Sequence, residues 1–377
     1  MKRTAFIIMI IILILTPAIG FCEYEELYSE DVKNAQEKIS ISSESLDNVK
    51  EILPDFNLSQ MVKDLSRGEF KFDFENIIKS IANIFVGEIK GNIRIMALLM
   101  AICLLVSLIS NMQSAFEKKG IEDVINFAAF SITCAIAAES FLEASAIGQR
   151  AIRDMSAFSQ GILPTMAFLL ISSGAPVKAG AMQPVVYVSA QIITVIIKNV
   201  VLPLSFISLA LAICSNINEA IKIKGVIKLT QKSIKWILTF LITIFIAVLT
   251  VTNFATQSLD SISGKALKFG VSTLIPVVGS SLSDALESTR AAASVVKSAL
   301  GAAGIIFVIA LCIIPLIKLG AIILIYKIAS AFSEPLSESV SACLSDISDT
   351  LSLIFSMVSS VAVLTIISMS ALLVTGG

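Results

Sequence analysis

The sequence predicts an all-α, polytopic membrane protein with about six to eight transmembrane helices. Apolar residues make up 56% of the chain and charged residues 15%, whereas soluble domains contain roughly half and a quarter. The apolar residues are also concentrated in long runs, and residues 236–251 and 351–377 carry no charge at all. A run of about 17–25 apolar residues is long enough to cross a bilayer as a helix. Residues from 93 onward are therefore predicted to form an integral membrane domain.

The first residues have the organisation of a secretory signal. Lys2 and Arg3 precede an apolar core at residues 5–15, which ends at Pro17 and is followed by small residues. This pattern predicts a signal peptide over residues 1–22. The alternative is an uncleaved anchor helix, because the core is short but very apolar.

Residues 23–92 are predicted to form an extracytoplasmic helical region. Residues 23–90 contain 15 acidic and 8 basic residues and few large apolar ones. Such a segment makes a weak core, so we expect two or three helices that lean on the membrane domain or on a partner. Because the segment follows a signal peptide, it is expected on the outer side of the membrane.

The next residues predict a transmembrane hairpin over residues 93–149, with spans at 95–109 and 124–141. Residues 142–160 are amphipathic and are expected to lie in the membrane interface. Residues 162–171 are too short to cross the bilayer untilted. They predict a re-entrant hairpin, which is tolerated where it is buried in protein or lines water.

Proline residues divide the remaining apolar stretches. Residues 182–215 would form a helix of about 50 Å, which exceeds a hydrocarbon core of about 30 Å. Pro203 lies inside this stretch, so two spans joined by a tight turn are favoured. Pro315 divides residues 294–332 in the same way. Residues 236–253 and 351–374 predict further spans.

The proline spacing indicates an internal repeat. Two pairs of prolines are each 39 residues apart, and the pairs are offset by 112 residues. The pairs are Pro164 with Pro203 and Pro276 with Pro315. The predicted repeats cover residues 150–253 and 254–377, which is typical of transporters and channels with broken helices. A chance match between apolar sequences remains the alternative, since few residues are identical.

The charges predict the orientation of part of the chain. Residues 221–235 contain five lysines and no acidic residue, which predicts a cytoplasmic connector. The turn Glu117-Lys118-Lys119 is expected on the same side. The connector at residues 333–350 contains four acidic residues and no basic one, so the side of the C-terminus stays open.

Few polar residues in the apolar stretches are candidates for function. Lys198 and Lys318 lie close to Pro203 and Pro315, and these four residues form the predicted conduit or helix-break region. The lysines either contact an anionic solute or snorkel from tight turns, and the second interpretation is favoured. Glu139 lies inside the second span and is a candidate intramembrane charge.

Two segments of the second repeat contain small residues. Ser294, Ser298 and Ala302 have the spacing that allows helices to pack closely, within the chain or between subunits. Residues 270–281 predict a short dip into the bilayer around Pro276 and Gly279.

Several function classes are disfavoured by composition. The chain has no histidine, and its six cysteines are far apart in sequence, so no metal site is predicted. No phosphate-binding glycine loop is present. The lysine-rich connector alternates with isoleucines, which favours anionic lipid over nucleic acid as its partner. We therefore expect no enzyme activity and no cofactor.

Short segments along the whole chain resemble the stage III sporulation protein AE family of endospore-forming bacteria. They are Gln113-Ser114-Ala115-Phe116-Glu117-Lys118, Ile275-Pro276-Val277-Val278-Gly279, Ser283-Asp284-Ala285 and Val296-Lys297-Ser298-Ala299-Leu300-Gly301-Ala302-Ala303-Gly304. Their order and spacing carry the resemblance, because no single motif is diagnostic.

The resemblance implies a location and partners that composition does not. It implies a protein of the mother-cell membrane around the forespore. It also implies a complex with other membrane proteins of the stage III A operon, which meets a forespore partner and resembles a secretion system. Family members have no assigned catalytic residues. The expected function is thus a membrane subunit of this channel complex. The alternative is a self-contained solute transporter with a site between two membrane halves.

Overall fold

Every element in the described part of the chain is a helix, as the sequence predicts. The computed structural model describes residues 43–53, 57–70, 74–113, 119–217, 223–274, 279–335 and 338–373. The predicted signal peptide lies outside these residues, as does the centre of the predicted dip at residues 270–281.

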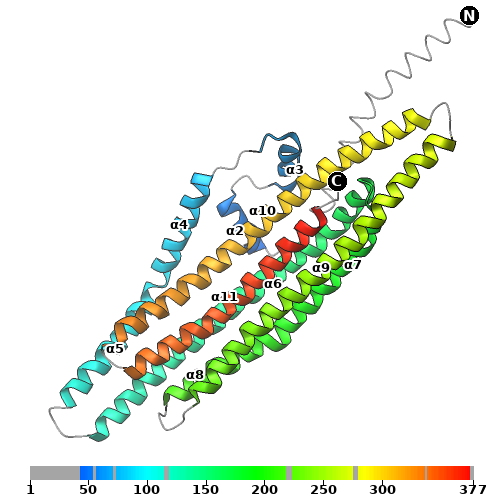
Figure 1. Cartoon of the computed structure of the whole chain (residues 1–377). Helices are drawn as coiled ribbons and strands as arrows, with labels where there is room; N and C mark the ends of the chain where they lie inside the picture. The colour runs from blue at the N-terminus through cyan, green and yellow to red at the C-terminus, as the bar shows by residue number, and fades with distance from the viewer. Residues whose placement is uncertain are drawn as a thin grey trace, which may run out of the picture.

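Long helices dominate the fold. α6 (Lys119–Ser172), α9 (Lys224–Leu274) and α10 (Gly279–Ser333) contain 54, 51 and 55 residues, so each is about 75–80 Å long. They form an elongated bundle with α11 (Glu338–Leu373), as Figure 1 shows. The hydrocarbon core of a bilayer is about 30 Å thick, so these helices reach well beyond it unless they are strongly tilted.

The predicted turn near Pro203 is wrong, because the chain stays helical there. α7 (Pro176–Ile196) leads into a π-helix, η1 (Ile197–Val201), and then into α8 (Leu202–Ile217). Pro203 lies just after the π-helix and not in a tight turn. Residues 176–215 count as one membrane span.

α6 also differs from the prediction. The segment at 142–160 is part of this helix, and Ala151, Met155 and Phe158 are buried in the bundle core, so it is not an interfacial helix. α6 continues through Pro164 without a re-entrant hairpin. α10 likewise continues through Pro315. Proline removes one backbone hydrogen bond, and packing against neighbouring helices holds the rest of the helix in place.

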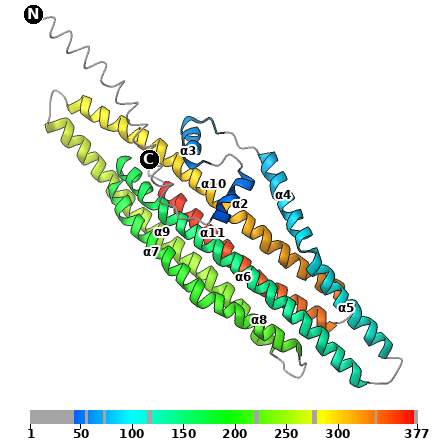
Figure 2. The ribbon, with the colours of Figure 1, turned by 180° about the vertical axis from the view of Figure 1, so that it is seen from behind.

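The bundle has a centre and two sides. α10 packs extensively against α11 and α6. α7, α8 and α9 lie along one side of this centre, and α2 (Ser43–Ile52), α3 (Leu58–Arg67) and α4 (Phe74–Gly91) lie along the other (Figures 1 and 2).

α4 leads into α5 (Ile93–Gln113) through a bend of 45°. The side chain of Asn92 donates a hydrogen bond to the carbonyl of Glu88 at this bend. Five helices in the described part of the chain are long and apolar enough to cross a membrane, and six if the bent α4–α5 pair is one span. The protein is thus a multi-pass helical membrane protein.

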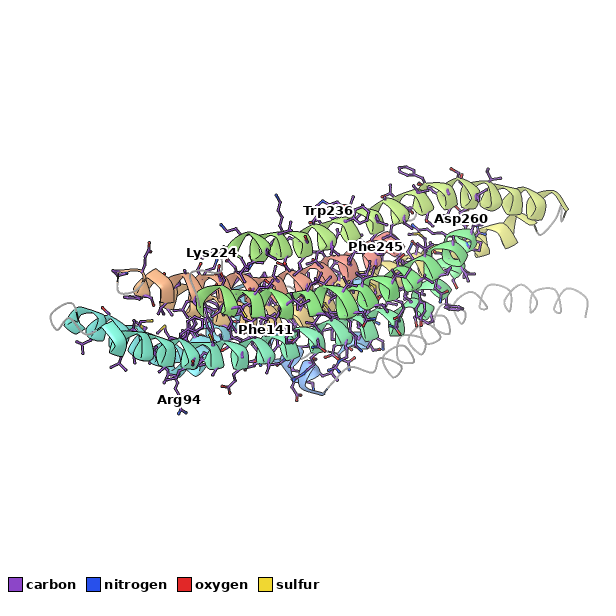
Figure 3. All side chains as sticks on the ribbon, turned by 90° about the horizontal axis from the view of Figure 1, so that it is seen from below. Arg94, Phe141, Lys224, Trp236, Phe245 and Asp260 are labelled. Carbon is purple, nitrogen blue, oxygen red and sulfur yellow. The ribbon has the colours of Figure 1, made fainter. Side chains whose placement is uncertain are left out.

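The connections alternate between the two ends of the bundle. The last turns of α5, α8 and α10 lie at one end, beside the first turns of α6, α9 and α11, whereas α6 and α9 finish at the other end, where α7 and α10 begin (Figure 1). Figure 3 labels Lys224 near the first end of α9 and Asp260 toward the second. The lysine-rich start of α9, residues 224–235, and the start of α6 at Lys119 therefore lie at the same end. Leu373, the last residue of α11, lies toward the opposite end.

The internal repeat remains a prediction. Both proposed copies end with a long helix, a connection and another long helix. The α8–α9 and α10–α11 connections follow Ile217 and Ser333, close to the expected offset. The preceding helices end at Ser172 and Leu274, about ten residues short of that offset. α6 also runs through the predicted boundary at residue 150, so the first hairpin and the first repeat share a helix.

Candidate functional site

A groove lined in part by polar side chains runs along the contact between α6 and the helix formed by α7, η1 and α8. Its open part has a volume of about 430 Å³ and is lined by Arg153, Ser156, Ala157, Gln160, Gly161, Pro164 and Thr194. It adjoins a narrower cavity of about 90 Å³, to which Ser145, Gln149, Arg153, Thr194 and Lys198 contribute their polar side chains. Arg153 and Thr194 line both hollows. We call this continuous hollow the α6–α7 groove.

The groove carries two cations and no acidic side chain. Arg153 of α6 and Lys198 of η1 are both exposed, and both line the narrower cavity. Within the described part of the chain, neither of them forms an ion pair or a side-chain hydrogen bond. Charged groups in membrane-spanning helices usually face water or pair with an opposite charge. The groove is therefore suited to water or to an anionic group from outside this chain.

The π-helix provides a local reason for the groove. Its wider turn, at Ile197–Val201, lies directly before Pro203, whose ring nitrogen has no hydrogen to donate. A π-turn often marks a functional position in a helix. Lys198 of this turn lines the same cavity as Arg153 of α6, while Ile197 and Val201 stay buried in the bundle.

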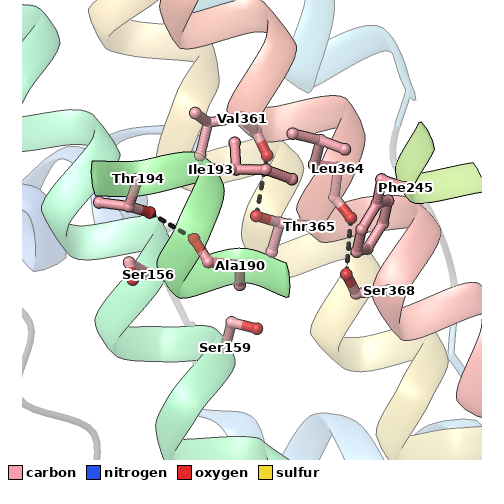
Figure 4. A pocket seen from close by; sticks show the side chains of 10 residues that line it. All are labelled: Ser156, Ser159, Ala190, Ile193, Thr194, Phe245, Val361, Leu364, Thr365 and Ser368. Atoms are coloured by element: carbon pink, nitrogen blue, oxygen red, sulfur yellow. Dashed lines mark hydrogen bonds between the residues drawn. The ribbon is translucent and has the colours of Figure 1, made fainter. Parts of the chain in front are cut away.

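A smaller cavity lies beneath the groove, inside the bundle (Figure 4). Its volume of about 20 Å³ suits one water molecule. Hydroxyls surround it, but several are already used: Thr194, Thr365 and Ser368 donate to the carbonyls of Ala190, Val361 and Leu364 at 2.8, 2.9 and 2.7 Å. Ser156 and Thr194 line both the groove and this cavity, so polar side chains continue from the groove into the bundle.

Buried charges gather at the end of the bundle opposite the lysine-rich connector. The carboxylate of Asp260 accepts hydrogen bonds from the backbone nitrogens of Val177 and Lys178, both at 2.9 Å. Asp260 thereby caps the first turn of α7, where negative charge is favourable. The side chains of Lys178 and Lys297 are 2% and 0% exposed. Sequence reasoning did not single out these three residues, because the contact joins residues more than 80 positions apart.

The predicted conduit residues do not lie together. Lys198 lines the α6–α7 groove, and the neighbouring Pro203 is exposed. Pro315 is buried in α10, which does not pack extensively against α8. The ammonium of Lys318 lies 3.9 Å from a carboxylate oxygen of Glu88 on α4. The structure thus places Lys318 in a separate groove between α4 and α10.

The close packing in α10 involves different residues from those predicted. Ser294 and Ala302 are half-buried, and Ser298 is exposed. The tight contact is at Gly301, where an added Cβ would clash with the side chain of Leu373. A contact of Ser298 within the chain is therefore absent from the described residues, and a contact between subunits stays a prediction. Glu139 is exposed on α6.

Comparison with known proteins identifies the family. A family model described as Stage III sporulation protein AE matches residues 56–376. The Stage III sporulation protein AE of Bacillus subtilis (strain 168) is 25% identical over 394 residues, covering 100% of this chain and 98% of the relative. No solved structure matches the chain. The match extends through the membrane bundle and includes both walls of the α6–α7 groove. The chain belongs to the stage III sporulation protein AE family.

Proposed function

We propose that the protein is an integral membrane component of a sporulation-specific channel complex between mother cell and forespore. In this proposal it resides in the mother-cell membrane around the forespore and is required for forespore development. Its partners are other membrane proteins of the stage III A operon and, through them, a forespore membrane protein. It contributes structure and a polar surface to the complex, without catalysis or a cofactor.

The α6–α7 groove is the observation that supports this role best. It presents Arg153 and Lys198 within helices long and apolar enough to cross a membrane. Two cations without an acidic neighbour are unfavourable against lipid, at about 2.5–3.5 kcal/mol each in the middle of a bilayer. A partner subunit with carboxylates, or a water-filled path, removes this penalty. Both surroundings exist in a channel complex.

The alternative function, a self-contained solute transporter, receives less support. It places a solute site between two halves near Pro203 and Pro315. α8 and α10, which contain these prolines, do not pack extensively against each other, and no described cavity includes both prolines. The geometry therefore favours a subunit that completes its polar surface with a partner.

The double variant Arg153→Gln, Lys198→Gln tests the proposal in the sporulating bacterium that encodes the chain. We expect normal accumulation in the membrane but a loss of forespore development. Co-purification with a differently tagged copy of the chain, and through it with the assembled complex, should fall by roughly tenfold or more, since loss of an interfacial charge pair costs about 2–5 kcal/mol.

The matched control is Arg94→Gln, Lys327→Gln, which removes two exposed cations that lie outside the groove. This variant should sporulate and co-purify normally. Normal sporulation of a strain that lacks the whole gene would refute the proposed function. Normal co-purification of the groove variant would refute the role of the groove.

A further inference from the structure

The outer face of α9 suits hydrocarbon. From Trp236 to Ile262 it exposes large apolar side chains, with Val251 and Phe254 exposed by 68% and 71%. Trp236 stacks on Phe240 with ring centroids 5.3 Å apart, and tryptophan is enriched at membrane interfaces. The threonines on this stretch donate to carbonyls four residues earlier in the same helix, so their hydroxyls need no water. They are Thr239, Thr243, Thr250 and Thr252.

The opposite face of the bundle suits water. α2 and α3 bury apolar residues such as Val49, Leu58 and Met61 toward the bundle. On their outer surfaces they expose charged side chains, which are Asp47, Lys50, Glu51, Lys63, Arg67 and Glu69. Figures 1 and 2 show α2–α4 and α9 on opposite sides of the central helices. So many charges on two short helices are very unfavourable in hydrocarbon.

α6 shows that these two faces lie at the same height along the bundle. The hydroxyl of Ser45 on α2 donates to the carboxylate of Asp154 on α6. Ser156 and Ser159 of α6 line the same cavity as Phe245 of α9, as Figure 4 shows. These α6 residues are two to five positions apart, which is about 3–8 Å along a helix. Charged α2 is therefore level with the middle of the apolar run of α9.

We infer that the face formed by α2 and α3 borders a water-filled space at the depth where the α9 face contacts lipid. This inference deepens the proposed function and rests on it, because it assigns one side of the subunit to the lumen of the channel. A water-filled space at this depth needs a protein wall on every side. Each chain has a lipid-compatible face and a water-compatible face, so further copies of this chain can form that wall.

In such a wall, neighbouring copies would contact each other on the side of the bundle that carries the α6–α7 groove. α6 contacts α2 through Asp154, and α7 packs against α9. The groove between α6 and α7 therefore lies on the flank of the bundle, between the lipid face and the water face. A neighbouring copy on this flank would cover Arg153 and Lys198, and its carboxylates would neutralise them.

Spin labels on the purified full-length protein in liposomes test the water and lipid assignment. Cysteines are introduced singly as Lys50→Cys on α2 and Ile244→Cys on α9, with Cys22 and Cys214 replaced by serine. Oxygen concentrates in hydrocarbon, whereas a charged nickel chelate stays in water. We expect the label at Lys50 to relax mainly with the nickel chelate and the label at Ile244 mainly with oxygen. Lys228→Cys on the basic connector is the reference for water.

Two outcomes would overturn the assignment: oxygen-dominated relaxation at Lys50, or relaxation at Ile244 as strong with nickel as at Lys228. Dipolar coupling between Lys50 labels on different copies should accompany assembly. In liposomes that each contain several copies, the absence of this coupling would refute the idea that copies of this chain form the wall of the water-filled space. These readouts need no sporulating cell, so they fail or succeed separately from the double-variant test of the proposed function.

Discussion

Asp260 connects two helices that are distant in sequence. Ala175, the residue before α7, has no side chain that can cap a helix, and the carboxylate of Asp260 on α9 takes that role. The cap is supplied by tertiary structure, which explains why the local sequence before Pro176 does not show it.

Removal of this cap should destabilise the end of the bundle where α7 begins. We expect Asp260→Ala to lower the free energy of unfolding by about 1–2 kcal/mol, the usual effect of losing a helix cap with a favourable charge. A thermal melt of the purified protein in detergent measures this change. Ser258→Ala is the control, because the Ser258 hydroxyl donates only to its own helix, at 3.5 Å, and is exposed. Equal melting temperatures for both variants would contradict the capping role.

Substitutions at Gly301 and Ser298 distinguish packing within the chain from packing between chains. Gly301→Leu places a side chain where Leu373 already lies, so we expect a loss of about 1–3 kcal/mol in stability from overpacking. Ser298→Leu adds the same side chain at an exposed position and should leave the melting temperature unchanged.

The assembly of several copies should respond in the opposite way to stability if copies contact each other through Ser294, Ser298 and Ala302 of α10. We expect Ser298→Leu or Ala302→Leu to reduce assembly more than Leu316→Ala, because large side chains hold helices apart where small ones had packed. Chromatography with light scattering measures the mass of the assembly. If both leucine variants assemble normally, this face contacts lipid and not another subunit.

At the scale of helices, α3 is a small element held by few side chains. Asn57 caps its first turn by accepting from the nitrogens of Ser59 and Gln60 at 3.0 and 3.2 Å. Gly68 ends it in the left-handed conformation, with φ of 70°. Leu58, Met61 and Val62 then hold the helix on the bundle.

A charge at Met61 should detach α3 without affecting the membrane helices. We expect Met61→Asp to expose α3, residues 58–67, to protease, since a buried unpaired carboxylate is strongly unfavourable. Limited proteolysis of the protein in liposomes measures the cleavage. The control Lys63→Asp adds the same group at an exposed position and should stay resistant. Equal cleavage of both would show that α3 is not held by its apolar face.

The apolar runs predicted the helices well, but the prolines predicted their ends poorly. Runs such as residues 236–253 and 351–374 lie within α9 and α11. Breaks were expected near Pro164, Pro203 and Pro315, yet the chain is helical through all three. A proline removes one hydrogen bond, and packing against neighbouring helices outweighs that loss. That packing cannot be read from one sequence.

The site was only half predictable for a similar reason. Lys198 can be found from the sequence, because it is a charged residue within an apolar stretch. Arg153 is on the polar side of an amphipathic segment, which the sequence alone assigned to the membrane surface. Only the packing of α6 on α7 brings the two into one groove, and the buried Lys178 and Lys297 depend on similar long-range contacts.

On the scale of the whole molecule, the bundle assigns a side to the C-terminus that the charges left open. α11 starts at the end that holds the lysine-rich start of α9 and runs toward the other end, and its last residue, Leu373, packs against Gly301 of α10. If the connector is cytoplasmic, the C-terminus is outside.

Reporter fusions after residue 377 test this topology. We expect alkaline phosphatase, which needs an oxidising compartment, to be active there. The same enzyme inserted after Lys228 should be inactive. An impermeant thiol reagent should likewise label Ser43→Cys but not Lys228→Cys in intact cells. Labelling of Lys228→Cys from outside would reverse the whole assignment.

The continuity of α6 has a mechanical consequence. α6 is one continuous helix of 54 residues, about 80 Å long. It runs from the end of the bundle where α9 begins to the end where α7 begins. A helix packed along its length moves as a rigid element. A partner that pushes this rod along its axis on one side of the membrane therefore displaces the far end by a similar amount. A force applied along the axis at Lys119 would thus be carried to Ser172, at the opposite end of the bundle.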